Sequence, residues 1–291
     1  FNELGQFFNF IINNDSIEDK ELAEKFENWK EEAEYAVSDA EAYNNWFTKD
    51  NITLALKSWS EALTTDNLLA WTKDYPFAKT PKNVGIIMAG NLPLVGFHDL
   101  LSVVISGNNA LIKTSSKDDK LIKLAIKYLN SIDSEFESII KIIERLQNFD
   151  AVIATGSNNT ARYFEQYFGK VPNIIRKNRT SVAVINGTET EEDLQNLGKD
   201  IFIYFGLGCR NVTKLYVKEE TQLHKVFEAI FPWGENVINH PKYANNYDYN
   251  RAIYLLGKDE FLDNNFVLFK KDDNVHSPIA VVNFEFYEDV H

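Results

Sequence analysis

Hydrophobic residues recur at helical spacing through the first quarter of the chain. From Ser16 to Tyr43 they follow one another at intervals of three or four, between charged residues: Leu22, Phe26, Trp29, Ala33, Val37 and Ala40. Ser16 and Asp19 resemble a capping box at the start of this helix. Two further helical patterns follow and end before Pro76, because proline cannot continue a helix. We therefore predict an N-terminal helical segment over residues 1–80.

The pattern changes after Pro81, where short apolar runs alternate with helical stretches. Four runs have the length and composition of buried strands: Val84–Met88, Ala110–Ile112, Ala151–Ala154 and Val182–Ile185. The stretches between them have helical periodicity: Asp99–Ser106, Lys117–Ser131, Ser138–Leu146 and Asn159–Phe168. Strands that alternate with helices form parallel sheets with crossover helices. The sequence thus predicts a doubly wound α/β domain over residues 81–187.

A further domain is predicted over residues 188–291. It begins with a helix that runs to about Phe205, continues through a glycine-containing turn that carries Cys209, and enters a strand at Lys214. The change from helix to turn to strand within about a dozen residues places the cysteine in the turn. The fold class predicted for the whole chain is α/β.

Composition narrows the class of protein. Of the 291 residues, 44% are hydrophobic, so the chain can bury a sizeable core. Its 43 acidic and 30 basic residues give a formal charge of −13, which argues against a surface that tracks nucleic-acid phosphates. No apolar run reaches the roughly 20 residues of a membrane span, and the opening residues lack the features of a signal peptide. A single cysteine excludes an internal disulfide, and we expect a cytoplasmic protein.

That single cysteine, Cys209, is the strongest candidate for chemistry. A lone cysteine is by default a small buried hydrophobic residue. Gly206 and Gly208, however, let the backbone approach a ligand closely, and Arg210 favours the thiolate, which is the nucleophilic form. A structural cysteine needs none of these neighbours. We therefore predict that Cys209 is a catalytic nucleophile.

Two predicted strands end in segments that suit a ligand. Asn91 follows the first strand and offers an amide donor for an oxyanion, although an asparagine near a proline also makes an ordinary turn. Thr155, Gly156 and Ser157 follow the third strand and open a helix, whose first N–H groups attract phosphate. This segment is not a full dinucleotide fingerprint, because many strand-to-helix turns contain glycine.

Basic and hydroxyl residues mark two other candidate sites. Lys113, Ser115 and Ser116 follow the second strand, where a nucleotide ribose is bound, and no acid lies among them. A 2′-phosphate would be tolerated there, and a helix cap beside a solvated lysine is the alternative. Arg176 and Arg179 form a basic run that suits a phosphate-bearing carrier or the cofactor, although such runs are commonly solvated loops.

Metal binding is not predicted. The histidines are scattered without the spacing of metal ligands, and there is no second cysteine. His276, which precedes a Ser-Pro pair, is the histidine that we retain as a candidate for contact with the substrate or its carrier. Arg210, beside the cysteine, is a candidate of the same kind.

Together these segments resemble the aldehyde dehydrogenase superfamily in their order and spacing, and within it the LuxC-type acyl-CoA reductases. The resemblance runs from about Lys82 to the end of the chain, and three stretches carry it: Gly90–Asp99, Ala154–Arg162 and Phe205–Asn211. It implies a Rossmann-type nucleotide-binding domain over 81–187, on which the N-terminal segment packs, and a catalytic α/β domain over 188–291. It also implies a homodimer and a chain that continues beyond His291.

The resemblance assigns roles to single residues. It implies Cys209 as the nucleophile, with the Asn91 amide and the Cys209 backbone N–H as donors to the oxyanion. Ser157 would lie near the cofactor diphosphate or nicotinamide, and Lys113 on the adenosine ribose. Members that use NAD carry a glutamate three positions after that lysine to bind both ribose hydroxyls. Here Ser116 stands at that position and leaves room for a phosphate, which favours NADPH over NADH.

A second departure from the superfamily concerns water. Its hydrolytic members carry a general-base glutamate on the strand after the Gly-Ser helix, whereas Thr180–Ile185 contains no acid. Without a base that activates water, a thioester is exchanged with a thiol and reduced rather than hydrolysed. We therefore predict NADPH-dependent reduction of an acyl-CoA or acyl-protein thioester to an aldehyde. The alternatives are an NAD-dependent acylating dehydrogenase for short acyl groups, a reductase of acyl phosphates, a cysteine thioesterase, and a binding protein without catalysis.

Overall fold

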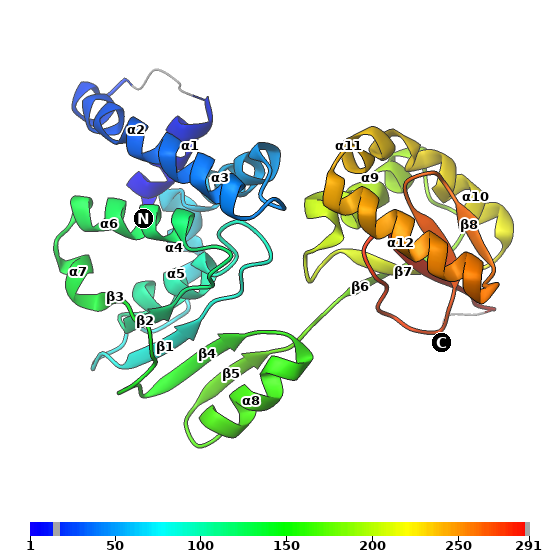
Figure 1. The fold of residues 1–291 in the computed structure, drawn as a ribbon. Helices are drawn as coiled ribbons and strands as arrows, with labels where there is room; N and C mark the ends of the chain where they lie inside the picture. The colour runs from blue at the N-terminus through cyan, green and yellow to red at the C-terminus, as the bar shows by residue number, and fades with distance from the viewer. Residues whose placement is uncertain (14–17, 289–291) are drawn as a thin grey trace. The chain divides into compact units, whose positions relative to one another are not determined.

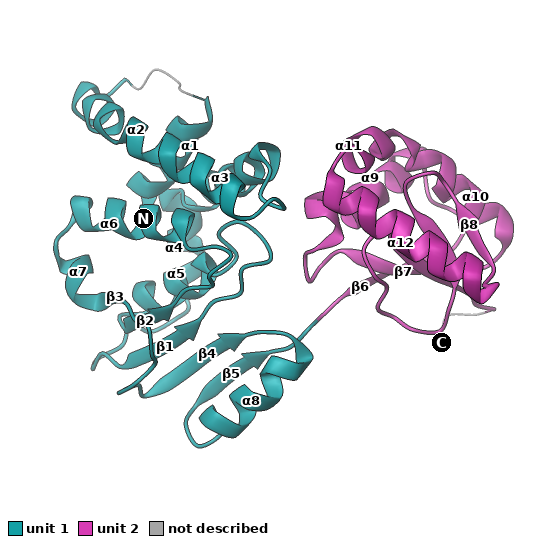
Figure 2. Cartoon of the chain, viewed as in Figure 1, with its two compact units in different colours: residues 1–178 teal, residues 179–291 magenta. Residues whose placement is uncertain are grey.

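The structure is a computed structural model that describes residues 1–13 and 18–288. The chain divides into two compact units, unit 1 over residues 1–178 and unit 2 over residues 179–291, which Figure 2 shows in different colours. Among the described residues, each unit contains a sheet of five strands. The two sheets have different strand orders, and each unit contains some of the predicted site residues.

Unit 1 is built on a parallel sheet with the strand order β3-β2-β1-β4-β5 (Figure 1). Its strands are β1 Asn83–Ile87, β2 Asn109–Lys113, β3 Ile140–Ile142, β4 Ala151–Thr155 and β5 Asn173–Arg176. Its connecting helices are α5 Phe97–Ile105, α6 Lys120–Ile132, α7 Glu135–Ile139 and α8 Asn158–Phe168. The chain moves outward from β1 to β3 and then returns to the other side of β1. This is the doubly wound order, so the predicted α/β class is confirmed.

One predicted helix is wrong. The sequence indicated a helix over Ser138–Leu146, but α7 ends at Ile139 and the chain continues as β3. Ile140 pairs with Ala110 of β2, and isoleucine side chains suit a pleated surface. The pairing with a neighbouring strand therefore overrides the local helical periodicity.

Four helices precede β1 among the described residues: α1 Asn2–Asn13, α2 Lys20–Tyr43, α3 Lys49–Ala62 and α4 Thr65–Thr72. Of these, α1 and α2 pack against α6, and α3 packs against α1. Asp19 caps α2, while Ser16 of the predicted capping box lies outside the described residues. The helical patterns of the sequence begin at Ser16, so they did not predict α1. This helix forms against a buried aromatic cluster, in which the ring of Phe7 stacks on Tyr128 of α6 at 4.1 Å between centroids.

Unit 2 has the strand order β6-β7-β10-β9-β8, in which only the β8–β9 pair is antiparallel among the described residues. Its strands are β6 Ser181–Ile185, β7 Val212–Val217, β8 Phe261–Asp263, β9 Leu268–Lys271 and β10 Val281–Phe286. Its helices are α9 Glu191–Phe202, η1 Ile203–Gly206, α10 Glu220–Ala229, η2 Phe231–Trp233, α11 Gly234–Ile238 and α12 Pro241–Gly257. We predicted β6 as part of the domain over 81–187, whereas the structure pairs it with β7. The domain boundary at residue 187 stays a prediction.

Candidate active site

The carboxyl ends of the parallel strands of unit 1 meet at one edge of its sheet. The last residues of β2, β4 and β5, and the segments after β1, β2 and β4, bring these sequence-predicted residues to that edge: Asn91, Lys113, Ser115, Ser116, Thr155, Gly156, Ser157 and Arg176. The neighbours β1 and β4 have connections that leave in opposite directions, and open α/β sheets bind ligands at such a point. The candidates predicted in unit 1 therefore share one edge.

Two of these segments, the β1 loop (residues 88–96) and the β2 loop (residues 114–119), pack directly against each other. A Cβ atom at Gly90 would lie 2.2 Å from the Oγ atom of Ser115 and 2.6 Å from its Cβ. Only glycine fits at this position. The predicted oxyanion segment and the predicted ribose segment therefore support one another.

The start of α8 has the geometry of an anion site. Ser157 caps the helix, because its Oγ atom accepts the N–H of Thr160 at 3.3 Å. The N–H of Gly156 donates to the carbonyl of Arg176 at 3.1 Å, which fixes the turn between β4 and the helix. A helix N-terminus at the carboxyl end of a strand attracts phosphate through its dipole and its first N–H groups.

Arg176, which is partly exposed, forms an ion pair with a buried carboxylate. Its Nη1 atom lies 2.7 Å from both carboxylate oxygens of Asp99, which is 4% exposed at the start of α5. Burial works to raise the pKa of Asp99, but its interactions with His98 and Arg176 outweigh burial and hold the pKa below its usual value. Through its Nη1 atom, Arg176 therefore links the end of β5 to the start of α5. Contact of Arg176 with the substrate or its carrier stays a prediction.

In unit 2, the turn before Cys209 has a left-handed backbone. Tyr204 and Phe205 have φ angles of 53° and 59°, and Gly206 follows at 76°. For a residue with a side chain this conformation costs about 1–2 kcal/mol, so tertiary contacts have to hold it. The buried ring of Phe205 supplies one, because it lies 4.4 Å between centroids from His240 at the start of α12.

Asn211 locks the same turn, and sequence reasoning missed it. Its buried side chain accepts the N–H of Gly208 at 2.7 Å and donates to three carbonyls at the end of α9 and in η1, at 2.9 to 3.3 Å. Cys209 lies between these two residues and is exposed, as is Arg210. The one signal for Asn211 in the sequence was its position two residues after the cysteine. The thiol is thus presented to solvent from a fixed backbone.

The other candidates of unit 2 lie at the same edge of its sheet as Cys209. Because β6, β7 and β10 are parallel, the segments that carry Arg179, Cys209 and His276 all reach the amino ends of these strands. The Thr213 hydroxyl joins two of the segments, since it contacts the Thr180 hydroxyl and donates to the Val275 carbonyl at 2.8 Å. Arg179 and His276 are exposed.

Within the described residues 1–13 and 18–288, the structure contains neither a cluster of metal ligands nor a membrane-spanning helix. No group of three or more His, Cys, Asp or Glu residues could hold a metal ion. Within the same described ranges, no helix is long and apolar enough to cross a membrane. The strand β6 contains no acidic residue, as the sequence indicated.

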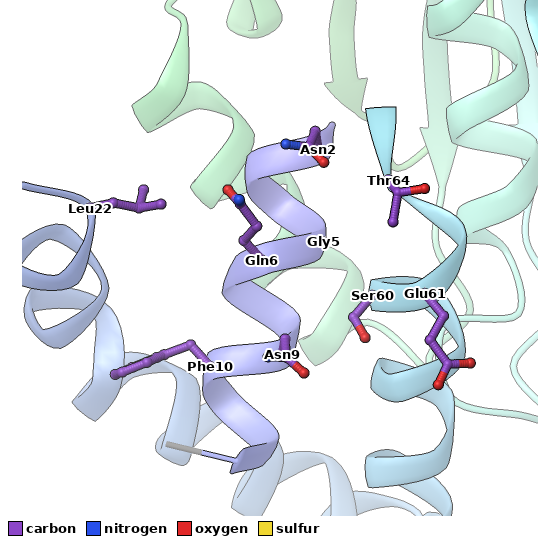
Figure 3. A pocket seen from close by; sticks show the side chains of 9 residues that line it. All are labelled: Asn2, Gly5, Gln6, Asn9, Phe10, Leu22, Ser60, Glu61 and Thr64. Carbon is purple, nitrogen blue, oxygen red and sulfur yellow. The ribbon is translucent and has the colours of Figure 1, made fainter. Parts of the chain in front are cut away.

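A pocket of about 430 Å³ lies away from these residues, among α1, α2 and α3 (Figure 3). Its lining is mostly amide, hydroxyl and apolar side chains: Asn2, Gly5, Gln6, Asn9, Phe10, Leu22, Ser60, Glu61 and Thr64. None of the sequence-predicted site residues lines it. Nothing in the structure assigns it a ligand.

Solved structures place the fold among the aldehyde dehydrogenases. Aldehyde dehydrogenase 21 from Physcomitrella patens, in complex with succinate, has a TM-score of 0.68 and 13% identity, over 99% of this chain and 69% of that chain. The NAD+ complex of an aldehyde dehydrogenase from Bacillus cereus has a TM-score of 0.63 and 13% identity, over 99% and 66%. These identities show a common fold and no more.

The family is shown by a sequence profile. The profile of the family described as acyl-CoA reductase (LuxC) matches residues 12–232. The chain belongs to this family and is an oxidoreductase enzyme, which confirms the resemblance seen in the sequence. Among curated proteins there is no match.

Proposed function

We propose that this enzyme reduces a fatty acyl thioester, carried on CoA or on a protein, to an aldehyde through an acyl group bound to Cys209, with NADPH as the reductant. One observation carries the proposal. The single cysteine of the chain is exposed on a turn whose backbone is left-handed and locked by Asn211. A cysteine that served only packing would be buried and would need no such support.

The residues of the chain perform the acyl transfer. The Cys209 thiolate attacks the carbonyl carbon of the thioester, and the Asn91 amide and the Cys209 N–H donate to the oxyanion that forms. The bond to the carrier sulfur then breaks, and the carrier thiol leaves. The absence of an acid on β6 leaves no base there to activate water, so the acyl group is held for reduction. After reduction, the bond between carbon and the Cys209 sulfur breaks, which frees the aldehyde and returns the thiolate.

The carboxyl edge of the unit 1 sheet fits a nicotinamide dinucleotide. Gly90 and Gly156 keep side chains out of the two loops, and the start of α8 suits a diphosphate. Lys113 and Ser116 are exposed beside them, and no acid lies between residues 113 and 117 to repel a 2′-phosphate. The cofactor, when bound, supplies the hydride for the reduction. The relatives that bind NAD+ support this assignment of the cofactor class.

Oxidation of reduced cofactor tests the proposal. The enzyme is incubated with NADPH or NADH and with long-chain or short-chain acyl-CoA, and the aldehyde is identified by mass spectrometry. We expect the largest kcat/KM for NADPH with a long chain. A preference for NADH with short chains identifies an acylating dehydrogenase instead, and release of CoA without cofactor oxidation identifies a thioesterase. A cytoplasmic location, a homodimer and contacts of Arg179, Arg210 and His276 with the carrier stay predictions.

A further inference from the structure

His276 lies in the segment that joins β9 to β10, called here the β9 loop (residues 272–280). In the described part of the chain its imidazole takes part in no hydrogen bond or ion pair, and it is exposed. The other described histidines each have a partner for the ring: His98, His224 and His240. The His276 imidazole is therefore available to a ligand.

Side chains of β7 and β10 fix the backbone of the β9 loop. Three of them donate to four of its carbonyls at 2.6 to 3.5 Å: Lys214 to Asp272, Thr213 to Val275, and Asn283 to Asn274 and His276. Lys214 is fully buried, and burying an ammonium group is costly unless it is paired. It pairs with Glu285 at 2.8 Å. The loop therefore has a fixed backbone, although the side chains of residues 273–276 are exposed.

The β9 loop ends at the amino edge of the unit 2 sheet. Because β9 and β10 are parallel, the loop has to return from the carboxyl end of one to the amino end of the other. Val275 is bound by Thr213, the second residue of β7, and the Ser277 hydroxyl donates to the carbonyl of Val281, the first residue of β10. His276 lies between these two contacts. It is therefore held at the amino ends of two neighbouring strands.

The cysteine turn is joined to this loop. Cys209 is three residues before the first residue of β7. The Thr180 hydroxyl donates to the Asn211 carbonyl at 3.3 Å and contacts the Thr213 hydroxyl, which in turn donates to the Val275 carbonyl. One chain of hydrogen bonds thus connects the backbone beside Cys209 with the backbone beside His276.

Of the candidates at this edge, His276 is the one suited to move a proton. An imidazole both donates and accepts a proton near neutral pH, whereas a guanidinium keeps its protons. Arg179 and Arg210 can therefore bind a carrier but cannot exchange a proton with it. The acyl transfer needs such an exchange, because a carrier sulfur leaves as a thiolate and ends as a thiol.

We propose, resting on the proposed function, that His276 is a catalytic acid–base residue for the carrier thiol. In acyl transfer the bond between the Cys209 sulfur and the carbonyl carbon forms, and the bond to the carrier sulfur breaks. The His276 imidazolium gives its proton to the leaving sulfur and regains one from water. In the reverse direction the neutral imidazole takes the proton of the carrier thiol as this thiol attacks the acyl group on Cys209.

The test compares two thiols that differ in their need for a base. Acyl-Cys209 is first formed in the whole enzyme, without cofactor, from the para-nitrothiophenyl ester of a long-chain fatty acid, whose leaving group is a stable thiolate. Transfer of the acyl group to CoA and to para-nitrothiophenol at neutral pH is then followed by mass spectrometry. An alkyl thiol such as that of CoA is only a few per cent ionised there, whereas para-nitrothiophenol is ionised already. A base therefore assists transfer to CoA alone.

We expect His276→Gln to slow transfer to CoA about 30-fold, which is the gain from ionising a thiol that is only a few per cent thiolate. Transfer to para-nitrothiophenol keeps the wild-type rate, which also shows that the variant is folded. The matched control is His224→Gln, at an exposed histidine of α10, which changes neither rate. An equal loss with both thiols, or no loss with either, overturns the proposal.

Thr213→Val tests the hold on the β9 loop. It removes the donor to the Val275 carbonyl and should slow transfer to CoA about threefold in the wild-type background, with no further loss in His276→Gln. The same threefold loss in both backgrounds would show that the loop does not act through His276. A wild-type enzyme that forms no acyl-Cys209 overturns the proposed function and this role together. An acyl enzyme that His276→Gln transfers to CoA at the wild-type rate removes His276 and leaves the proposed function standing.

Discussion

The two sheets present their candidate residues at opposite ends of their strands. In unit 1 the cofactor candidates follow the strands, at the carboxyl edge, where turns and a helix start supply the geometry. In unit 2 Cys209, the proposed nucleophile, precedes strand β7 at the amino edge, and a turn with left-handed residues precedes it. The first arrangement is a general property of doubly wound sheets, whereas the second depends on the side-chain contacts of Phe205 and Asn211. Binding and chemistry should therefore respond to different substitutions.

The largest effect is expected at Cys209. Cys209→Ser should lower aldehyde formation by a factor on the order of 10⁴ or more, because the nucleophile of the acyl transfer is lost. Binding of NADPH, measured by fluorescence titration, should keep its Kd, since the residues assigned to the cofactor belong to unit 1. A Cys209→Ser enzyme that still makes aldehyde would show that another residue carries the acyl group.

Asn91 tests whether unit 1 also takes part in chemistry. Asn91→Ala should lower kcat by a factor on the order of 100 to 1,000 through the loss of an oxyanion donor. The rate of Cys209 alkylation by iodoacetamide should not change, because that reaction forms no oxyanion. Full activity of Asn91→Ala would remove this residue from the mechanism and leave unit 1 with binding alone.

Asn211 tests the support of the cysteine turn. Asn211→Ala leaves the Gly208 N–H and three carbonyls without their side-chain partner, which should lower the free energy of unfolding by about 2–4 kcal/mol. Urea unfolding followed by tryptophan fluorescence measures it. The matched control is Asn236→Ala on the exposed face of α11, with an expected change within about 0.5 kcal/mol. Equal changes in the free energy of unfolding of both variants would mean that the turn keeps its conformation without the Asn211 side chain.

The smallest of these effects is expected for a substitution at Ser116, which should change the preference between NADPH and NADH. Ser116→Glu adds a negative charge where the 2′-phosphate of NADPH is proposed to lie, and its carboxylate can accept both ribose hydroxyls of NADH. The ratio of kcat/KM for NADPH to that for NADH should fall about tenfold. Ser116→Gln, of similar size without the charge, should move the ratio much less. An unchanged ratio in Ser116→Glu would place the 2′ position elsewhere.

The sequence predicted what depends on local pattern. Short apolar runs predicted β1, β2 and β4 of the unit 1 sheet but neither β3 nor β5, and the parallel order then brings Asn91, Lys113 and Ser157 to one edge. It missed what depends on contacts between distant residues. The helix α1 is stabilised by Tyr128 of α6, and β3 by pairing with β2.

Two polar residues were missed for a related reason. Asn211 reads as an ordinary turn residue, because nothing in the sequence shows that its amide reaches back to α9. Asp118 reads as an exposed acid before a helix, because nothing in the sequence shows that its side chain is buried. Of the two, Asn211 holds the turn of Cys209, a residue that the sequence did identify.

The central claim is that Cys209 carries the acyl group. The most direct measurement is intact and peptide mass spectrometry after incubation with a long-chain acyl-CoA in the absence of cofactor. The account predicts one acyl adduct on the peptide that contains Cys209, absent from Cys209→Ser and removed with release of aldehyde when NADPH is added. No adduct, an adduct on another residue, or an adduct that NADPH leaves in place would contradict it.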